Sequence, residues 1–134
     1  MIRQASATRS RAVEVALAHI EAWSHRNYEE VKKKLADDVH STVTTTQPTM
    51  PGTDTVGVDK YMSGLKKFGE IVVPGSVRIM ASSGDDRNAL VMVEMKVALG
   101  PGAPDVPLVG GRLYLVDEAG KVSAEQVIFT VLSP

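Results

Sequence analysis

The apolar residues of this chain repeat with a helical period early in the sequence and mostly with a period of two later on. Within residues 10–24, apolar side chains recur at the three- and four-residue spacing that lines one side of a helix: Val13, Ala16, Leu17, Ile20 and Trp23. From residue 76 onward, apolar and polar residues alternate, as in strands that bury one face. Because the helices are segregated from a block of consecutive strands, the pattern predicts an α+β fold with an antiparallel sheet.

Three helices and five strands are expected. The second helix should begin at Asn27, which has the spacing of a capping box with Glu30, and it should end at residues 36–38. A third helix should end at Gly69, and its apolar stripe contains Val58, Tyr61, Leu65 and Phe68. Strands are expected at residues 39–46, 76–83, 89–99, 111–116 and 121–132, and proline-rich loops at residues 47–54 and 100–107.

A strongly bent sheet wrapped as a cone around the long first helix would bury the apolar stripe of that helix. Such a cone leaves a cavity at its open end, and the two proline-rich loops should border the mouth of that cavity. No internal repeat or composition change divides the sequence. Residues 1–134 are therefore expected to form one domain.

Composition argues against several classes of function. The 15 Lys and Arg residues balance 16 Asp and Glu residues, and no basic stripe is visible, so nucleic-acid binding is not expected. The absence of cysteine excludes disulfides, thiolate metal sites and a cysteine nucleophile. No apolar run reaches the length of a signal peptide or a membrane span, so a cytoplasmic location without a membrane partner is expected.

Cofactor and metal motifs are also missing from the sequence. His25 and His40 have no partner at metal-ligand spacing. No glycine-rich phosphate loop, serine elbow or dinucleotide fingerprint occurs. We therefore expect a chain that uses no metal and no cofactor.

Three segments carry a resemblance to a known family: AHIEAWSHRNYEEVKKKLADDV, the helix at GVDKYMSGL, and the closing hairpin YLVDEAGKVSAEQVIF. Together they resemble the SnoaL-like and ketosteroid-isomerase-like branch of the nuclear transport factor 2-like superfamily, over nearly the whole chain. The resemblance implies a cone-shaped fold with a small-molecule pocket and a homodimer formed through the convex sheet face. This fold hosts isomerases, polyketide cyclases, dehydratases, epoxide hydrolases and binding proteins. It also implies that Asp37 and Asp38 are structural residues that end the second helix.

The resemblance does not extend to the catalytic residues of the steroid isomerases. The position of their general base is Val43 here, and a valine cannot abstract a proton. His19 takes the place of their oxyanion tyrosine, and Arg112 takes the place of their neutral carboxylic acid. Phe129 retains the aromatic residue of the pocket wall. Steroid isomerisation is therefore not expected.

The candidate catalytic residues are His19, Arg112 and Glu125. His19 is either an acid-base group at the mouth of the cone or a boundary histidine bonded to the backbone. Arg112 and Glu125 belong to the last hairpin, where residue 112 is expected to pair with residue 125 or 126. The two side chains form either an arginine donor held by a glutamate inside the pocket or an ion pair on the solvated face. Ligand-binding residues are expected to be Trp23, Val43, Tyr114, Val127 and Phe129.

Two functions remain open at this point. One is an acid-base enzyme, such as a cyclase, isomerase, dehydratase or hydrolase, acting on a small hydrophobic oxygenated molecule. The alternative is a non-catalytic dimeric module for ligand binding or assembly. For the convex face, the sequence predicts the apolar residues Val77, Ile79, Val91, Val93, Leu113, Leu115 and Ile128, with Glu94 also pointing outward.

Overall fold

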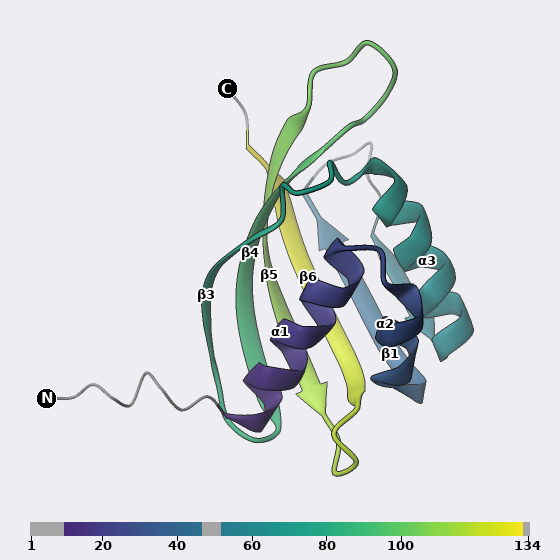
Figure 1. Ribbon diagram of the computed structural model, residues 1–134, viewed down its shortest axis with the longest axis vertical. Coiled ribbons are helices and arrows are strands. Elements are labelled where there is room, and N and C mark those ends of the chain that lie inside the picture. The colour runs from purple at the N-terminus through teal and green to yellow at the C-terminus, as the bar shows by residue number, and fades with distance from the viewer. Residues whose placement is uncertain (1–9, 47–51, 133–134) are drawn as a thin grey trace, which may run out of the picture.

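A computed structural model describes residues 10–46 and 52–132, and in these residues three helices stand against one curved six-stranded sheet (Figure 1). The α+β prediction is therefore confirmed. The helices are α1 (Arg11–Ser24), α2 (Tyr28–Lys33) and α3 (Val58–Ile71). The strands are β1 (Leu35–Thr45), β2 (Thr53–Val56), β3 (Arg78–Gly84), β4 (Asn88–Val97), β5 (Val106–Val116) and β6 (Val122–Val131). No helix in the described part of the chain is long and apolar enough to cross a membrane.

Helix α1 begins and ends close to the predicted bounds. Its N-cap is Ser10, whose hydroxyl accepts a hydrogen bond from the backbone N–H of Val13. The helix buries Ala12, Val13, Ala16, His19, Ile20 and Trp23, so its apolar stripe faces the concave side of the sheet. This burial fixes α1 as the central element that the sheet curves around (Figure 1).

The region of the acidic pair differs from the prediction. Asn27 is the N-cap of α2, but its side chain makes no capping hydrogen bond, and the helix ends at Lys33. Strand β1 begins two residues later, so Asp37 and Asp38 lie inside this strand as exposed residues and do not end a helix. The physical reason is that Leu35 and Val39 are buried within β1, while a register irregularity between Leu35 and His40 leaves the aspartates in solvent.

The sheet has the order β2-β1-β6-β5-β4-β3 and is mixed. The prediction of an antiparallel sheet is wrong at one pair, because β1 runs parallel to β6. Strand β2 is also an addition, since Thr53–Val56 pairs antiparallel with β1 where a loop was expected. Its four residues are too few to show a strand pattern in the sequence, and the strand forms because it pairs with β1. Residues 47–51 of the expected loop lie outside the described residues.

The third helix continues past its predicted end to Ile71. Gly69 lies inside the helix and is buried, because its missing side chain leaves room for the hydroxyl of Tyr28. Arg26 donates hydrogen bonds from Nη2 to the carbonyl oxygens of Gly69 and Val72, at 2.8 and 3.2 Å. The C-terminal end of α3 is therefore held by an arginine.

The outer face of the sheet carries fewer of the predicted residues than expected. Val91 and Val93 are buried in the core, Val77 packs against that core, and Ile79 pairs with Val93 on the same side. Glu94 points outward as predicted, and Leu90 does the same, so the residues that alternate with them, Val91 and Val93, face the core and not the outer side. The apolar residues on the outer face include Leu90, Met92, Val109, Leu113, Leu115 and Ile128.

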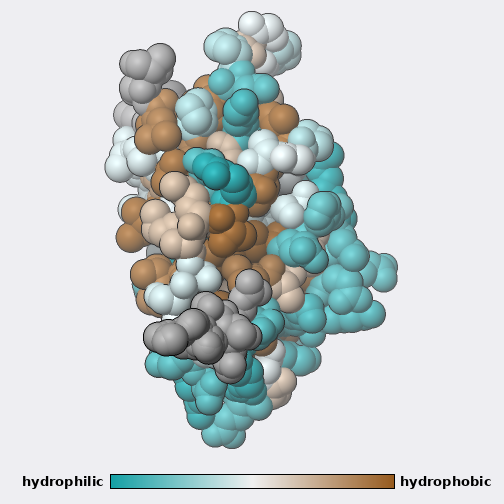
Figure 2. All heavy atoms as spheres, turned by 60° about the vertical axis from the view of Figure 1, so that its left-hand side comes forward, coloured by the Kyte–Doolittle hydropathy of each residue, from teal (hydrophilic) through white to brown (hydrophobic). Residues whose placement is uncertain are grey.

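Figure 2 brings the β3 side of the molecule forward and shows hydrophobic residues gathered across its middle, with hydrophilic residues along its lower and right margins. Several large apolar side chains are well exposed, among them Leu90, Leu115 and Ile128, the last at 64%. Arg78 and Glu94 form an ion pair across β3 and β4 on the outer face. Apolar surface therefore covers much of the sheet on the side that faces away from α1.

Candidate functional site

A cavity of about 310 Å³ opens between α3 and the inner face of β2, β1, β6 and β5. This volume is at the lower end of the range that is typical of small-molecule sites. Its apolar lining consists of Val43, Leu65, Phe68, Val127 and Phe129. The rest of the lining is Ser41, Thr53, Thr55, Lys60, Tyr61, Gly64, Arg112 and Glu125. No residue of the predicted loop at 100–107 lines the cavity, so the expectation that this loop borders the mouth is wrong.

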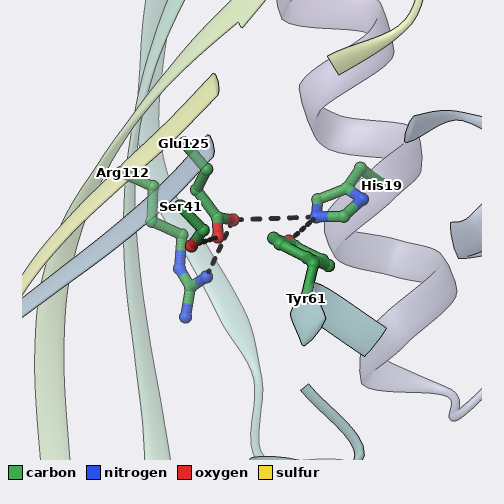
Figure 3. A network of polar contacts seen from close by, with 5 residues as sticks. All are labelled: His19, Ser41, Tyr61, Arg112 and Glu125. Carbon is green, nitrogen blue, oxygen red and sulfur yellow. Dashed lines mark hydrogen bonds and ion pairs between the residues drawn. The ribbon is translucent and has the colours of Figure 1, made fainter. Parts of the chain in front are cut away.

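The inner end of the cavity is polar and is built around Glu125 (Figure 3). The hydroxyl of Ser41 donates a hydrogen bond to Glu125 Oε1 at 3.1 Å. Arg112 Nη1 lies 3.6 Å from Glu125 Oε2, and both side chains are almost completely buried. The predicted pocket pair is therefore present, and the alternative of a solvated ion pair is wrong.

The register of the closing hairpin differs from both predicted pairings. Tyr114 stands opposite Glu125, and Arg112 stands opposite Val127. Arg112 and Glu125 are therefore diagonal neighbours on the same face of the sheet, which is close enough for long side chains to meet. A register irregularity between Leu115 and Val116, next to the turn, explains why counting across the turn gave the wrong partner.

His19 lies behind the cavity wall. The sequence predicted it either at the mouth of the cavity or as a boundary histidine hydrogen-bonded to the backbone. Its ring is fully buried and does not line the cavity. His19 Nε2 lies 2.8 Å from the hydroxyl oxygen of Tyr61 and 3.7 Å from Glu125 Oε2 (Figure 3). Since Tyr61 and Glu125 both line the cavity, His19 meets a bound molecule only through them.

The predicted ligand-binding residues divide into two groups. Val43, Val127 and Phe129 line the cavity, as expected. Trp23 and Tyr114 do not line it and form a second layer. The Arg112 guanidinium lies 4.8 Å from the centre of the Trp23 ring, and the Tyr114 ring meets the His19 ring edge-on at 5.5 Å. These aromatic residues therefore pack against polar groups of the site instead of a ligand.

The electrostatics of the site keep Glu125 charged. Burial alone would raise the pKa of Glu125, but the neighbouring ring of His19 and the positive charge of Arg112 outweigh it and lower this pKa from 4.5 to about 2. Arg112 also stays ionised, because the charges around it more than compensate for the effect of burial on its pKa. The inner end of the cavity thus holds a fixed pair of opposite charges.

The two tyrosines beside this pair remain neutral. Burial raises the pKa of Tyr61 well above its usual value, and the negative charge of Glu125 raises it further. The same two causes raise the pKa of Tyr114, whose hydroxyl has no hydrogen-bond partner among the described residues. Tyr61, which lines the cavity together with Arg112, therefore keeps its hydroxyl protonated.

Sequence reasoning missed five polar residues of the cavity: Tyr61 and Ser41 at its inner end, and Thr53, Thr55 and Lys60. Tyr61 was counted only as part of the apolar stripe of its helix, although a hydroxyl on a buried helix face needs a polar partner. Ser41 occurs between Val39 and Val43 at a spacing of two, so all three residues share one face of β1. A polar residue in such a row was the signal that this face borders a polar site.

No family model matches the chain, and no curated protein matches it. Solved structures do match over most of its length. A protein from Rhodopseudomonas palustris proposed to be an isomerase has a TM-score of 0.73 at 11% identity, over 91% of this chain and 90% of its own. A proposed SnoaL-like polyketide cyclase from Shewanella denitrificans has a TM-score of 0.70 at 16% identity, over 90% and 91%.

A third match is a Mycobacterium tuberculosis protein solved in complex with estradiol-17beta-hemisuccinate, at a TM-score of 0.69 and 14% identity, over 89% of this chain and 93% of its own. Other matching structures are described as having a cystatin-like fold or as nuclear transport factor 2-like, at TM-scores of 0.67 and 0.60. At these identities the matches establish the fold, which agrees with the resemblance seen in the sequence. The chain therefore has the cystatin-like, nuclear transport factor 2-like fold.

Proposed function

We propose that this protein binds one small hydrophobic molecule through an oxygen atom at the inner end of the cavity and catalyses an acid-base reaction there. The observation that carries the proposal is that Tyr61, Arg112 and Glu125 converge on one largely apolar cavity. Proteins of this fold are associated with related chemistry, since the matching structures include an epoxide hydrolase, a proposed isomerase and a proposed cyclase. One of them binds a steroid ester.

The proposed chemistry is stabilisation of negative charge on an oxygen of the ligand. Tyr61 is a neutral hydroxyl donor, and Arg112 is a charged donor held in place by Glu125. Preorganised donors of this kind act strongly in a cavity with little water, because they need no reorganisation when charge develops. A ligand carbonyl, epoxide or comparable oxygen placed between them would gain stabilisation as its bond breaks or as an enolate forms.

His19 is proposed to move the proton, although it reaches the ligand only through another residue. Its Nε2 is hydrogen-bonded to the Tyr61 hydroxyl, so His19 can replace the proton that Tyr61 gives to the ligand oxygen, while the α-proton of the ligand leaves to solvent water. Glu125 is a poor candidate for the general base, because a carboxyl group with a pKa of about 2 holds a proton weakly at neutral pH. Glu125 is therefore assigned the role of orienting Arg112 and balancing its charge.

A hydrophobic ketone with exchangeable α-protons tests the catalytic part of this proposal. The protein should accelerate exchange of the α-protons of 2-tetralone for deuterium, measured by proton NMR in D₂O. Tyr61→Phe and Arg112→Met should each slow the protein-dependent exchange by at least about tenfold, since each removes one donor to the enolate. Arg78→Ala changes an exposed arginine in an ion pair outside the site and serves as the control.

A binding or assembly function without catalysis is the second candidate. Two observations favour it: the carboxylate of Glu125 is a weak base, and His19 lies behind the wall of the cavity. Binding of 2-tetralone without any acceleration of exchange would support this function over the enzyme. Failure to bind hydrophobic ketones, epoxides and alcohols at millimolar concentration would contradict both.

We also propose that the chain forms a homodimer through the outer face of the sheet. This face exposes Leu90, Leu113, Leu115 and Ile128 around Gly111, so the middle of the sheet is apolar on this side. A second copy that presents the same surface would cover these side chains with apolar side chains of its own.

A further inference from the structure

The polar residues of the cavity follow a gradient of exposure from its inner end to its mouth. Glu125, Ser41 and Thr55 occupy one row across β6, β1 and β2, because Ser41 is the register partner of both Glu125 and Thr55. Glu125 and Ser41 are buried, whereas Thr55 is half-exposed. Thr53 and Lys60, which also line the cavity, are exposed. The cavity thus has a buried polar end and a separate polar mouth.

Lys60 gives the mouth a positive charge without a partner. It is in the first turn of α3, where the helix dipole adds further positive potential, so a cation there is unfavourably placed. Within the described residues, no carboxylate lies at ion-pair distance from its amine. Among the residues that line the cavity, Arg112 and Glu125 balance each other, and Lys60 leaves a net charge of about +1.

We infer that the natural ligand is a hydrophobic carboxylate whose carboxylate group pairs with Lys60 at the mouth, while a neutral oxygen of the same molecule meets Arg112 and Tyr61 inside. This inference rests on the proposed function and assigns its ligand class and orientation. The opposite orientation is disfavoured, because a ligand carboxylate at the inner end would lie against the ionised Glu125 in a buried site. The hydroxyls of Thr53 and Thr55 supply further donors at the mouth.

Gly64 keeps the entrance to this cavity open. It lies one helical turn after Lys60 on α3 and lines the cavity, and a Cβ atom added to it would meet no atom within 4 Å. Glycine within a helix is less stable than alanine by about 1 kcal/mol, so its presence here needs another reason. A large side chain at this position would project into the entrance without disturbing the packing of the helix. Gly64→Leu is therefore a means of blocking the cavity.

A matched pair of probes tests the inference: 2-naphthylacetate, which carries the carboxylate, and 2-naphthylacetamide, which has the same ring system and no charge. Affinities are measured by isothermal titration calorimetry at pH 7. We expect the acid to bind about fivefold more tightly than the amide, as an ion pair at a partly exposed site is worth about 1 kcal/mol. Raising the salt concentration to about 0.5 M should shrink this preference, because exposed ion pairs are screened.

Two lysine variants test whether Lys60 causes the preference for the acid over the amide. Lys60→Gln should remove most of the preference for the acid and leave the affinity of the amide unchanged. Lys67→Gln is the control, since Lys67 is an exposed lysine of the same helix that does not line the cavity, and it should keep the preference. Gly64→Leu should weaken binding of both probes by at least about tenfold, with a melting temperature no lower than that of wild type.

Each contrary outcome has a separate meaning. Equal binding of acid and amide to the wild type, or an acid preference that persists in Lys60→Gln, overturns the inference and leaves the proposed function intact. Binding of both probes that is unchanged in Gly64→Leu places them outside the cavity and also overturns the inference. Binding of neither probe at millimolar concentration contradicts the proposed function and the inference together.

Discussion

The guanidinium of Arg112 lies over the indole ring of Trp23, 4.8 Å from the ring centre, while its Nη1 atom lies 3.6 Å from Glu125 Oε2. A buried cation is thus held between an aromatic face and a carboxylate. The aromatic face limits the positions that Arg112 can take, and the carboxylate balances its charge. We therefore expect Arg112 to contribute both to the stability of the fold and to ligand binding.

Replacing Arg112 with alanine should destabilise the fold and weaken ligand binding. Glu125 would be left as an uncompensated buried charge, which costs about 3–5 kcal/mol of unfolding free energy, and its pKa should rise. Loss of one charge-assisted hydrogen bond should reduce the affinity for a carbonyl ligand by more than tenfold, or about 1.5–3 kcal/mol. Urea denaturation and calorimetry measure these two effects.

Arg78→Ala is the matched control for this substitution, because it breaks an arginine-glutamate pair that is largely exposed. Its effect should not exceed about 1 kcal/mol. If Arg112→Ala and Arg78→Ala both lower the unfolding free energy by the same small amount, the buried pair of Arg112 and Glu125 does not stabilise the fold more than an exposed pair does.

Acid should remove part of the stability of the fold through Glu125. The folded-state pKa of this group is about 2 and its ordinary value is 4.5. A carboxyl group whose pKa is lowered by folding stabilises the protein above its unfolded pKa, and this contribution disappears as the pH falls from about 4.5 to about 2. The linked free energy is on the order of 3 kcal/mol. Chemical denaturation at a series of pH values should show a smaller slope in this window for Glu125→Gln than for wild type.

Replacing the two glycines within α3, Gly64 and Gly69, by alanine should change the unfolding free energy in opposite directions. Gly64→Ala should raise the unfolding free energy by up to about 1 kcal/mol, because the new methyl group meets open space. Gly69→Ala should lower it, because the methyl group would collide with the hydroxyl of Tyr28. The double variant Gly69→Ala with Tyr28→Phe should recover much of the loss in thermal denaturation. If both single variants stabilise the protein, the packing of Tyr28 against α3 is not as described.

Self-association through the outer face should depend on Ile128. Sedimentation velocity at micromolar concentration is expected to show a dimer for the wild type and a monomer for Ile128→Glu, since a charge would be buried at the interface. Val56→Glu is the control, because Val56 is similarly exposed, at 59%, but belongs to β2 at the far edge of the sheet. A monomeric wild type, or a dimer that tolerates Ile128→Glu, would contradict the proposed interface.

The sequence by itself determined which segments are helices and which are strands over most of the chain, since a helical or a twofold period is set by local geometry. One example is the helical stripe ending at Trp23, and another is the spacing of two between Arg112 and Tyr114, which places both on one face of the strand. Both sets of residues are buried as that periodicity requires. The resemblance to proteins of one superfamily added the architecture and the location of a pocket. The strand pairing of β1 with β6 was not visible, because nothing local distinguishes a parallel neighbour from an antiparallel one.

Only the tertiary structure decided how the site is assembled. The position of His19 behind the wall, and of Tyr61 between His19 and the cavity, depends on how α3 packs across the sheet, and contacts of this kind join residues 42 positions apart. The pairing of Arg112 with Glu125 depended on a register irregularity near the turn, which shifts the partners of every residue beyond it. Long-range packing and register are set by the whole core together, so periodicity and spacing could identify the candidate residues but not their neighbours.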